Sequence, residues 1–319
     1  MKTPILYLVV PCYNEEEVLL ETTNQLRLKM NTLIKNKKIS KESHVVFIND
    51  GSKDNTWEMI EEIHANDSLF SGIKLSRNCG HQNAVMAGLM TCRDKADAII
   101  SLDADLQDDI NAIDSMVEKY KEGNEIVYGV RSSRKKDTFF KRTTAQGFYK
   151  FAKKMDVEMV YNHADYRLLS KKALEALSEF KEVNLFLRGM VPMLGFKQDV
   201  VYYERQERFA GTSKYPLKKM LALAMNGITG SSIKPALIIT KLGFLTLIIS
   251  FILILIFLVK FFMGLTVAGW PTIVISIWLL GGLNLTAIGI LGQYVGKTYM
   301  ETKHRPLYII EKIVHKKGD

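Results

Sequence analysis

Short apolar runs alternate with amphipathic segments along the first 130 residues of the chain. The apolar runs are rich in β-branched residues and predict buried strands at 5–10, 45–48, 73–75, 98–102 and 126–129. The segments between them have helical periodicity, at 15–35, 54–65, 81–92 and 111–121. This alternation predicts an α/β domain with a mostly parallel sheet and helices on both faces.

Each of the first four predicted strands is followed by a polar or glycine-containing segment. These segments are PCYNEE at 11–16, NDGSKDNT at 49–56, SRNCGHQ at 76–82 and DADLQDD at 103–109. Open α/β sheets bind their ligands at the carboxyl ends of the strands. Four such segments at one edge therefore predict a binding cleft.

The second half of the chain has a different pattern. Amphipathic, lysine-containing segments at 139–155 and 216–228 suit either a helix in the membrane interface or a core-facing helix. For the second segment, the apolar run that follows favours the interface. Two apolar runs, at 236–262 and 268–293, are each long enough to cross a bilayer. They predict a two-helix transmembrane hairpin and exclude a purely soluble protein.

The formal net charge is +9, and its positive excess lies in three clusters, at 131–142, 197–241 and 297–319. Two clusters flank the predicted hairpin, which suits the positive-inside rule and an anionic inner leaflet better than nucleic acid. We therefore expect a multi-pass protein of the cell membrane with two spans, and with both termini and the folded domain in the cytoplasm. Cys12, Cys79 and Cys92 match no metal-ligand spacing, so we expect reduced thiols.

The DADLQ segment carries the first candidate chemistry. Asp103 and Asp105 alternate at the end of a predicted strand, and the amide of Gln107 follows two residues later. Oxygen ligands of this kind suit Mg²⁺ or Mn²⁺, which in turn bind nucleotide diphosphates. An ordinary solvated acidic loop is the alternative. The preceding apolar strand and the neighbouring polar loops favour the metal site.

Other loop residues have two interpretations on this pattern alone. Asp50 is suited to accept hydrogen bonds from a base or ribose, but its segment is also typical of a turn. Tyr13 is suited to stack on a base. Glu15 has the alternative interpretation of a negative charge at the start of a helix. Arg77 and His81 either face phosphates or cap local structure.

Together with YGVRSSR at 128–134, ADYRLLS at 164–170 and RFAGTSKYP at 208–216, these segments resemble family 2 glycosyltransferases of the GT-A fold. The closer likeness is to the polyprenyl-phosphate glycosyltransferases, such as dolichol-phosphate mannose synthase and the bacterial bactoprenol glucosyltransferases. It spans essentially the whole chain. The likeness implies a GT-A domain at 1–210, an interfacial amphipathic segment at 211–235, two transmembrane helices within 236–293 and a basic cytoplasmic tail at 294–319.

The resemblance also assigns site residues. It implies a donor-binding set of Pro11, Tyr13, Glu15, Ile48, Asp50, Asp103, Ala104, Asp105, Arg208 and Lys214. It implies the metal ligands Asp103, Asp105 and Gln107, and a catalytic set of Asp165, Arg131, Arg134 and Arg167. Whether Asp165 is a base or an orienting residue stays open. The Gln-x-x-Arg-Trp motif of processive synthases is absent from the sequence, which argues against a polymerase.

The activity that the resemblance implies is an inverting hexose transfer from a nucleotide sugar to undecaprenyl (polyprenyl) phosphate at the cytoplasmic membrane face. UDP-glucose is the first candidate donor, and the lipid-linked sugar would serve modification of cell-envelope glycans. The same reaction with UDP-GlcNAc or GDP-mannose is one alternative, and a catalytically silent membrane scaffold is another. Mg²⁺ or Mn²⁺ is the expected cofactor. Membrane lipids are expected partners and nucleic acid is not, while a homo-oligomer stays open.

Overall fold

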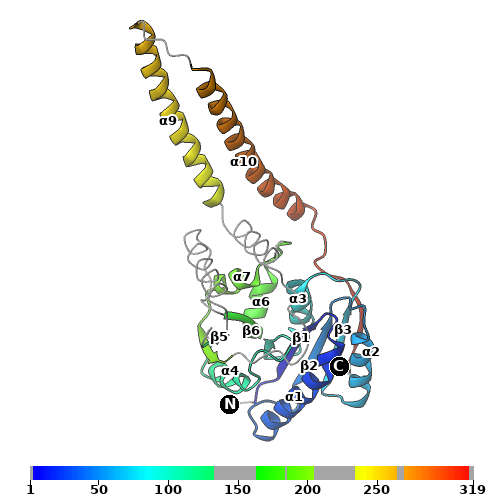
Figure 1. The fold of residues 1–319 in the computed structure, drawn as a ribbon. Helices are drawn as coiled ribbons and strands as arrows, with labels where there is room; N and C mark the ends of the chain where they lie inside the picture. The colour runs from blue at the N-terminus through cyan, green and yellow to red at the C-terminus, as the bar shows by residue number, and fades with distance from the viewer. Residues whose placement is uncertain (1–2, 133–162, 184, 205–233, 264–268, 316–319) are drawn as a thin grey trace.

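The computed structural model describes residues 3–132, 163–183, 185–204, 234–263 and 269–315. Over these ranges the chain forms an α/β domain and two long helices that extend away from it on one side (Figure 1). The strands are β1 Leu6–Cys12, β2 His44–Asn49, β3 Phe70–Leu75, β4 Ala98–Ser101, β5 Ile126–Arg131, β6 His163–Ser170, β7 Gln198–Tyr203 and β8 Ile310–Val314. The helices are α1 Glu16–Lys35, α2 Thr56–Asn66, α3 His81–Cys92, α4 Ala112–Lys121, α6 Lys171–Ser178, α7 Leu187–Met193, α9 Lys234–Phe262 and α10 Trp270–Thr302.

Eight strands of the described chain form one mixed sheet, in the order β7-β5-β6-β4-β1-β2-β3-β8. β1 is parallel to β2 and β4, β2 is parallel to β3, and β5 is parallel to β7. β6 lies antiparallel between β4 and β5, and β8 is antiparallel to β3. The predicted α/β domain is confirmed, and these two antiparallel strands make its sheet mixed.

Helices cover both faces of the sheet, and the central strands are apolar on both sides. Leu8 and Val10 of β1 pack in a core cluster with α1, α2 and α4, whereas Val9 packs in a second cluster with α3, α6 and α7. A Cβ added to Gly88 of α3 would lie 2.4 Å from the Val9 Cγ1 atom, so glycine permits the close contact between α3 and β1. All three cysteines are free thiols, as predicted.

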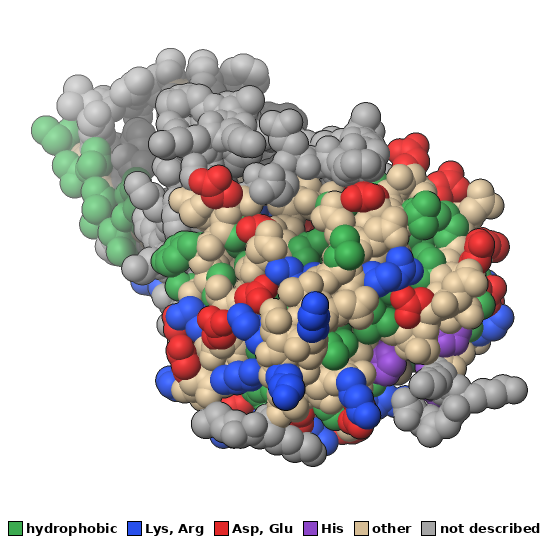
Figure 2. Space-filling model, turned by 90° about the horizontal axis from the view of Figure 1, so that it is seen from below, with side chains coloured by type: hydrophobic (Ala, Val, Ile, Leu, Met, Phe, Trp, Pro, Cys, Tyr) green, Lys and Arg blue, Asp and Glu red, His purple; other side chains and the backbone are tan. Residues whose placement is uncertain are grey.

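α9 and α10 carry most of the exposed large hydrophobic side chains in the described chain. Seen from the opposite end of the molecule, the domain surface instead mixes acidic and basic side chains (Figure 2). Within the described residues, Leu279–Thr302 has the length and composition needed to cross a membrane. The structure therefore contains one candidate span, in α10. The second span of the predicted hairpin stays a prediction.

The end of the chain returns to the domain after α10. Leu307 and Tyr308 pack against the second core cluster, and β8 pairs with β3 so that Ile313 lies opposite Ile73. Figure 1 shows this segment running down from α10 to the C-terminus beside α2. From the sequence we expected 294–319 to be a tail beyond the spans. In the structure, residues up to Thr302 complete α10, and β8 becomes an edge strand of the α/β domain.

Candidate active site

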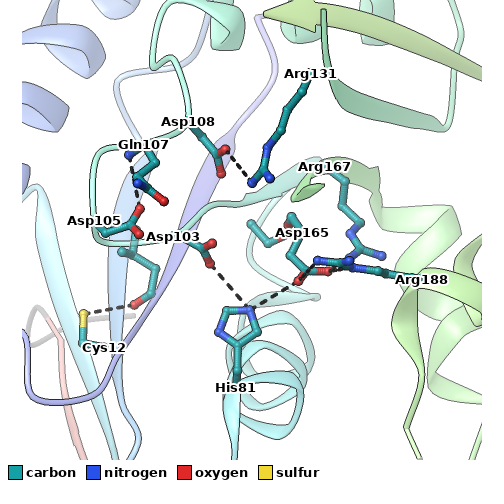
Figure 3. A network of polar contacts seen from close by, with 12 residues as sticks. Cys12, His81, Asp103, Asp105, Gln107, Asp108, Arg131, Asp165, Arg167 and Arg188 are labelled. Carbon is teal, nitrogen blue, oxygen red and sulfur yellow. Dashed lines mark hydrogen bonds and ion pairs between the residues drawn. The ribbon is translucent and has the colours of Figure 1, made fainter. Parts of the chain in front are cut away.

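The polar segments predicted at the strand ends meet at one edge of the sheet. Because β1, β2 and β4 are parallel neighbours, the loops that follow them lie side by side. β5 ends at this edge with Arg131, and the antiparallel β6 begins there and brings Asp165 and Arg167. Figure 3 shows the result: the acidic loop 103–108 lies on one side of the site and the arginines lie on the other.

Asp50 holds the loop after β2 against the loop after β3. Its side chain is buried, and its Oδ1 and Oδ2 accept hydrogen bonds from the backbone N–H groups of Cys79, at 2.6 Å, and Gly80, at 3.0 Å. Burial raises the pKa of Asp50, and these hydrogen bonds only partly offset the rise. Gly51 has a φ of +64°, and a Cβ there would lie 2.4 Å from the Asn78 nitrogen. The predicted contact of Asp50 with a nucleoside stays a prediction.

Hydrogen bonds also tie the loop after β1 to the loop after β2. The Asn14 N–H donates to Ser52 Oγ at 3.0 Å, and the Lys53 N–H donates to Asn14 Oδ1 at 2.8 Å. The predicted donor-binding residues Tyr13 and Glu15 lie in the loop after β1 and are partly exposed. Pro11 of β1 and Ile48 of β2, also predicted to bind the donor, are buried and lie opposite each other in the sheet. The loops around the predicted nucleoside site therefore form one bonded unit.

The loop after β4 presents two carboxylates at the edge of the site. The side chains of Asp103 and Asp105 are partly exposed, and Asp105 Oδ1 accepts a hydrogen bond from the Gln107 N–H at 3.2 Å. Beneath them, Ala104 is buried and its carbonyl accepts a hydrogen bond from the Thr22 hydroxyl at 2.7 Å. The backbone of the loop is thus anchored to α1 while its carboxylates face the site (Figure 3).

The donor chemistry of this loop fits a divalent metal ion. Two carboxylates and an amide offer only oxygen ligands, and Mg²⁺ is commonly held by one or two carboxylates together with substrate phosphates. No group of three His, Cys, Asp or Glu that could hold a metal occurs within the described ranges, so further ligands would come from a substrate. Burial raises the pKa of Asp103, His81 opposes this rise, and the charges of Asp165 and Asp105 add to it. A cation at the loop would relieve that repulsion.

Asp165 lies at the centre of a cationic cluster. Its Oδ1 accepts hydrogen bonds from Arg167 Nη2 at 2.6 Å and Arg188 Nε at 3.1 Å, and its Oδ2 accepts one from Arg188 Nη2 at 2.9 Å. Burial opposes ionisation, yet Arg188 and Arg167 hold the pKa of Asp165 well below its usual range. The Arg167 side chain is only 2% exposed. Two guanidinium groups against one carboxylate leave this side of the site positive.

His81 lies between the acidic loop and the cationic cluster. Its Nε2 is 3.5 Å from Asp103 Oδ1 and 3.8 Å from Asp165 Oδ2. The next residue, Gln82, accepts the Leu187 N–H through its Oε1 at 2.9 Å. This hydrogen bond fixes the start of α7, and with it the arginine that follows. The start of α3 is therefore in contact with both halves of the site (Figure 3).

Arg131 faces a second, more deeply buried carboxylate. Asp108 is 4% exposed, and its Oδ1 accepts a hydrogen bond from the Tyr203 hydroxyl at 2.5 Å. Arg131 Nη2 lies 3.7 Å from the same oxygen. Burial raises the pKa of Asp108 to about 6, and the charge of Asp103 adds to the rise. Asp108 thus connects the acidic loop to Arg131.

The structure brings six of the predicted catalytic and metal-binding residues to one site: Asp103, Asp105, Gln107, Arg131, Asp165 and Arg167. The predicted catalytic residue Arg134 and the predicted donor-binding residues Arg208 and Lys214 lie outside the described residues. Arg188 was not predicted, although it is a single charge in the apolar run 185–191, which is an unusual place for one. Tyr203 gave no local signal, because its partner Asp108 is 95 residues away in the chain.

Known proteins resemble this chain over most of its length. The sequence profile described as "Glycosyl transferase family 2" matches residues 7–178. The uncharacterized glycosyltransferase YkoT of Bacillus subtilis (strain 168) is 51% identical over 308 residues, which cover 97% of this chain and 91% of the relative. The prophage bactoprenol glucosyl transferase homolog of Escherichia coli (strain K12) is 39% identical over 312 residues, which cover 96% of this chain and 98% of the relative. Among solved structures, mannosyl-3-phosphoglycerate synthase from Rubrobacter xylanophilus has a TM-score of 0.47 and is 14% identical to this chain. The match covers 70% of this chain and 71% of the synthase.

Proposed function

The chain belongs to glycosyl transferase family 2, and we propose that it transfers a hexose from a nucleotide sugar, with UDP-glucose as the first candidate, to undecaprenyl phosphate at the cytoplasmic face of the membrane. The observation that carries this proposal is the meeting, at one sheet edge, of an oxygen-rich acidic loop and a cluster of arginines. The acidic loop suits a metal-bound diphosphate, and the arginine cluster suits a phosphate. The family and the relatives together make the chain a glycosyltransferase.

The donor binds on the acidic side of the site. Asp103, Asp105 and Gln107 would hold Mg²⁺ or Mn²⁺, which when bound neutralises charge on the diphosphate leaving group. The loops containing Tyr13, Glu15 and Asp50 would hold the nucleoside, since hydrogen bonds already join them into one unit. Arg208 and Lys214, as the family resemblance implies, would contact the phosphates of the donor.

The acceptor needs no strong base. A lipid monophosphate has a second pKa near ~6 and is already a nucleophilic anion at neutral pH. One of its oxygens forms a bond to the anomeric carbon from the face opposite the diphosphate, and the electron pair of the breaking C–O bond leaves with the nucleoside diphosphate. Both oxygens of Asp165 are engaged by Arg167 and Arg188, and the lowered pKa of Asp165 makes it a poor base. We therefore assign Asp165 the orienting role, and Arg131, Arg134 and Arg167 the binding of phosphate and the neutralisation of its charge.

The pairing of β8 with β3 supports two membrane crossings. Because β8 is hydrogen-bonded into the sheet, the chain leaves the domain and returns to it on one side of the membrane. If α10 crosses the bilayer, α9 crosses it in the other direction, since an odd number of crossings would separate β8 from its partner strand. Lys234 and Lys303, at the domain ends of these helices, favour the cytoplasm for that side. We retain 1–210 as the catalytic domain, 211–235 as the interfacial segment and 236–293 as the spans, and add 310–314 to the domain.

Two alternatives differ from this proposal in specific ways. UDP-GlcNAc or GDP-mannose would serve the same site, and the names of the bactoprenol glucosyl transferase relatives favour glucose. A silent scaffold would have no need for two carboxylates and a guanidinium cluster at one edge. The family membership also favours an active enzyme.

The test is transfer by the purified full-length protein in detergent, with undecaprenyl phosphate and labelled UDP-glucose, UDP-GlcNAc or GDP-mannose. We expect a lipid-linked glucose that forms only with a divalent metal ion. Asp105→Asn should abolish formation of the product. Asp109→Asn is the control and should not, because the Asp109 carboxylate belongs to the same segment but accepts the Asn111 N–H at 2.9 Å. No lipid-linked product from any of the three donors would refute the proposed function.

A further inference from the structure

Two residues beside Arg131, Asp108 and Tyr203, have no role in the proposed chemistry. Asp108 is the last residue of the acidic loop 103–108 and is 4% exposed, and Figure 3 shows its carboxylate directed at the Arg131 guanidinium. Tyr203 is also buried, at the end of β7. The register of β5 and β7 pairs Tyr203 directly with Arg131.

Tyr203 contacts both Asp108 and Ser132, the residue that follows Arg131. Its hydroxyl donates to Asp108 Oδ1 at 2.5 Å, and its backbone carbonyl accepts hydrogen bonds from the N–H of Ser132, at 2.9 Å, and from the Ser132 hydroxyl, at 3.0 Å. The Tyr203 hydroxyl also interacts with the Arg131 guanidinium. A single tyrosine therefore connects the acidic loop, the guanidinium and the backbone that follows it.

The geometry of Asp108 is not that of a group placed for stability. Its Oδ2 and the Nε of Arg131 are both buried without a hydrogen-bond partner among the described residues. A buried polar atom without a hydrogen-bond partner destabilises the folded state. At 3.7 Å, the Arg131 Nη2 atom is attracted by the Asp108 carboxylate but is not hydrogen-bonded to it. The Asp108 carboxylate thus orients the Arg131 guanidinium by charge attraction and leaves its Nη2 atom able to donate to another group.

We propose that Asp108 and Tyr203 are positioning residues that hold Arg131 in the orientation in which it binds a substrate phosphate. This inference rests on the proposed function, because it takes Arg131 as a phosphate ligand. Asp108 supplies the attraction, and Tyr203 fixes Asp108 relative to the end of β5. Without them, Arg131 keeps its charge but loses its direction, and a bidentate contact depends on direction.

A double-mutant cycle on transfer in detergent tests this inference. Asp108→Asn keeps an oxygen that can accept from Tyr203 and removes only the charge, so the variant should fold. We expect Asp108→Asn and Tyr203→Phe each to lower kcat/KM by about tenfold or more, and to change the same kinetic parameter, for the same substrate, as Arg131→Gln does. In an Arg131→Gln background, Asp108→Asn should cost less than about twofold, because the residue it acts through is gone.

Tyr166→Phe is the matched control. The Tyr166 ring packs edge-on against Tyr203 at 5.5 Å, and its hydroxyl donates to the backbone carbonyl of Asp109 at 3.1 Å. It therefore anchors the same loop without reaching Arg131, and near wild-type kcat/KM is expected. Equal losses in Tyr166→Phe and Tyr203→Phe, or an equal cost of Asp108→Asn in both backgrounds, would overturn the positioning role. If the wild-type protein transfers no sugar at all, the proposed function fails, and this inference fails with it.

Discussion

Replacing Asp165 by Asn should reveal how much the site depends on the carboxylate that pairs with a buried arginine. The substitution removes the carboxylate that pairs with Arg167 and Arg188 at 2.6 Å and 2.9 Å. Arg167 is 2% exposed and would keep its charge away from water, which costs about 3–5 kcal/mol when a buried pair loses one partner. Arg188 is 37% exposed, so solvent screens its charge once the carboxylate is gone, and the loss of this second pair lowers the free energy of unfolding little. For a domain of this size each 1 kcal/mol lowers Tm by about 2–4 °C, so we expect a fall of about 6–20 °C.

A second variant and the pH dependence separate this cause from a general loss of packing. Asp165→Asn combined with Arg167→Met removes both charges and should recover most of the lost stability, because apolar groups often replace a buried ion pair at little cost. The folded-state pKa of Asp165 lies below its ordinary value of about 3.9. Its stabilisation is therefore fully present above that value and is lost only as the pH falls through the lowered pKa. Asp165 itself therefore does not titrate between about pH 5 and about pH 8, so the difference in Tm between wild type and Asp165→Asn should not vanish anywhere in this range.

The assay is thermal unfolding of the full-length protein in detergent, with transfer measured on the same preparations. Asp114→Asn is the control, because Asp114 also pairs with two cations, Lys29 at 2.7 Å and Lys38 at 3.3 Å, but is 29% exposed. It should cost less than about 1 kcal/mol. Three results would contradict this role of the Asp165 charge: Asp165→Asn no less stable than Asp114→Asn, the double variant least stable of all, or a difference in Tm that vanishes between about pH 5 and about pH 8.

Three further predictions concern the metal, the contacts with the donor diphosphate and the membrane topology. EDTA should stop transfer, Mg²⁺ or Mn²⁺ should restore it in the wild type but not in Asp105→Asn, and full activity in EDTA would contradict the metal assignment. Lys214→Gln and Arg208→Gln should insert normally but transfer roughly 10²-fold more slowly in detergent, because a charge-assisted contact to the diphosphate is lost. Near wild-type rates would remove both residues from the site. A thiol reagent that does not cross membranes should label Gly264→Cys in intact cells and Lys303→Cys only after permeabilisation, and the reverse pattern would exclude the proposed topology.

The strands and loops of the first half of the fold could be predicted because burial on both faces leaves a clear pattern. β1 is buried at all seven positions, and a central parallel strand of this kind appears in the sequence as an apolar run followed by polar residues at its carboxyl end. The predicted helix at 81–92 coincides with α3, His81–Cys92. The position of the DADLQ loop could be predicted for the same reason. Its position at a strand end follows from the strand itself.

The parts that could not be predicted depend on contacts that are distant in sequence. β8 has the sequence IEKIV, in which the polar pair Glu311 and Lys312 belongs to an exposed edge strand, so nothing in it suggests a buried element. Its place in the sheet comes from Ile313 opposite Ile73 and from the pairing of Lys74 with Glu311 at 3.0 Å. Only the packed fold brings these residues together. The arginine of α7 was missed on the same grounds, since its partner carboxylate lies 23 residues away on another element.

The direction of β6 explains how one sheet edge holds both halves of the proposed site. Parallel strands bring only residues at their carboxyl ends to this edge, and here those ends supply the acidic loop and Arg131. Because β6 runs antiparallel between β4 and β5, its amino end reaches the same edge, and Ser101 at the end of β4 pairs with Arg167. Asp165 and Arg167 are two residues apart on one strand, so their side chains share a face and form their ion pair without a loop. A parallel β6 would carry both residues to the opposite edge, and the carboxylates suited to a metal-bound diphosphate would then have no cationic cluster beside them to receive a second phosphate.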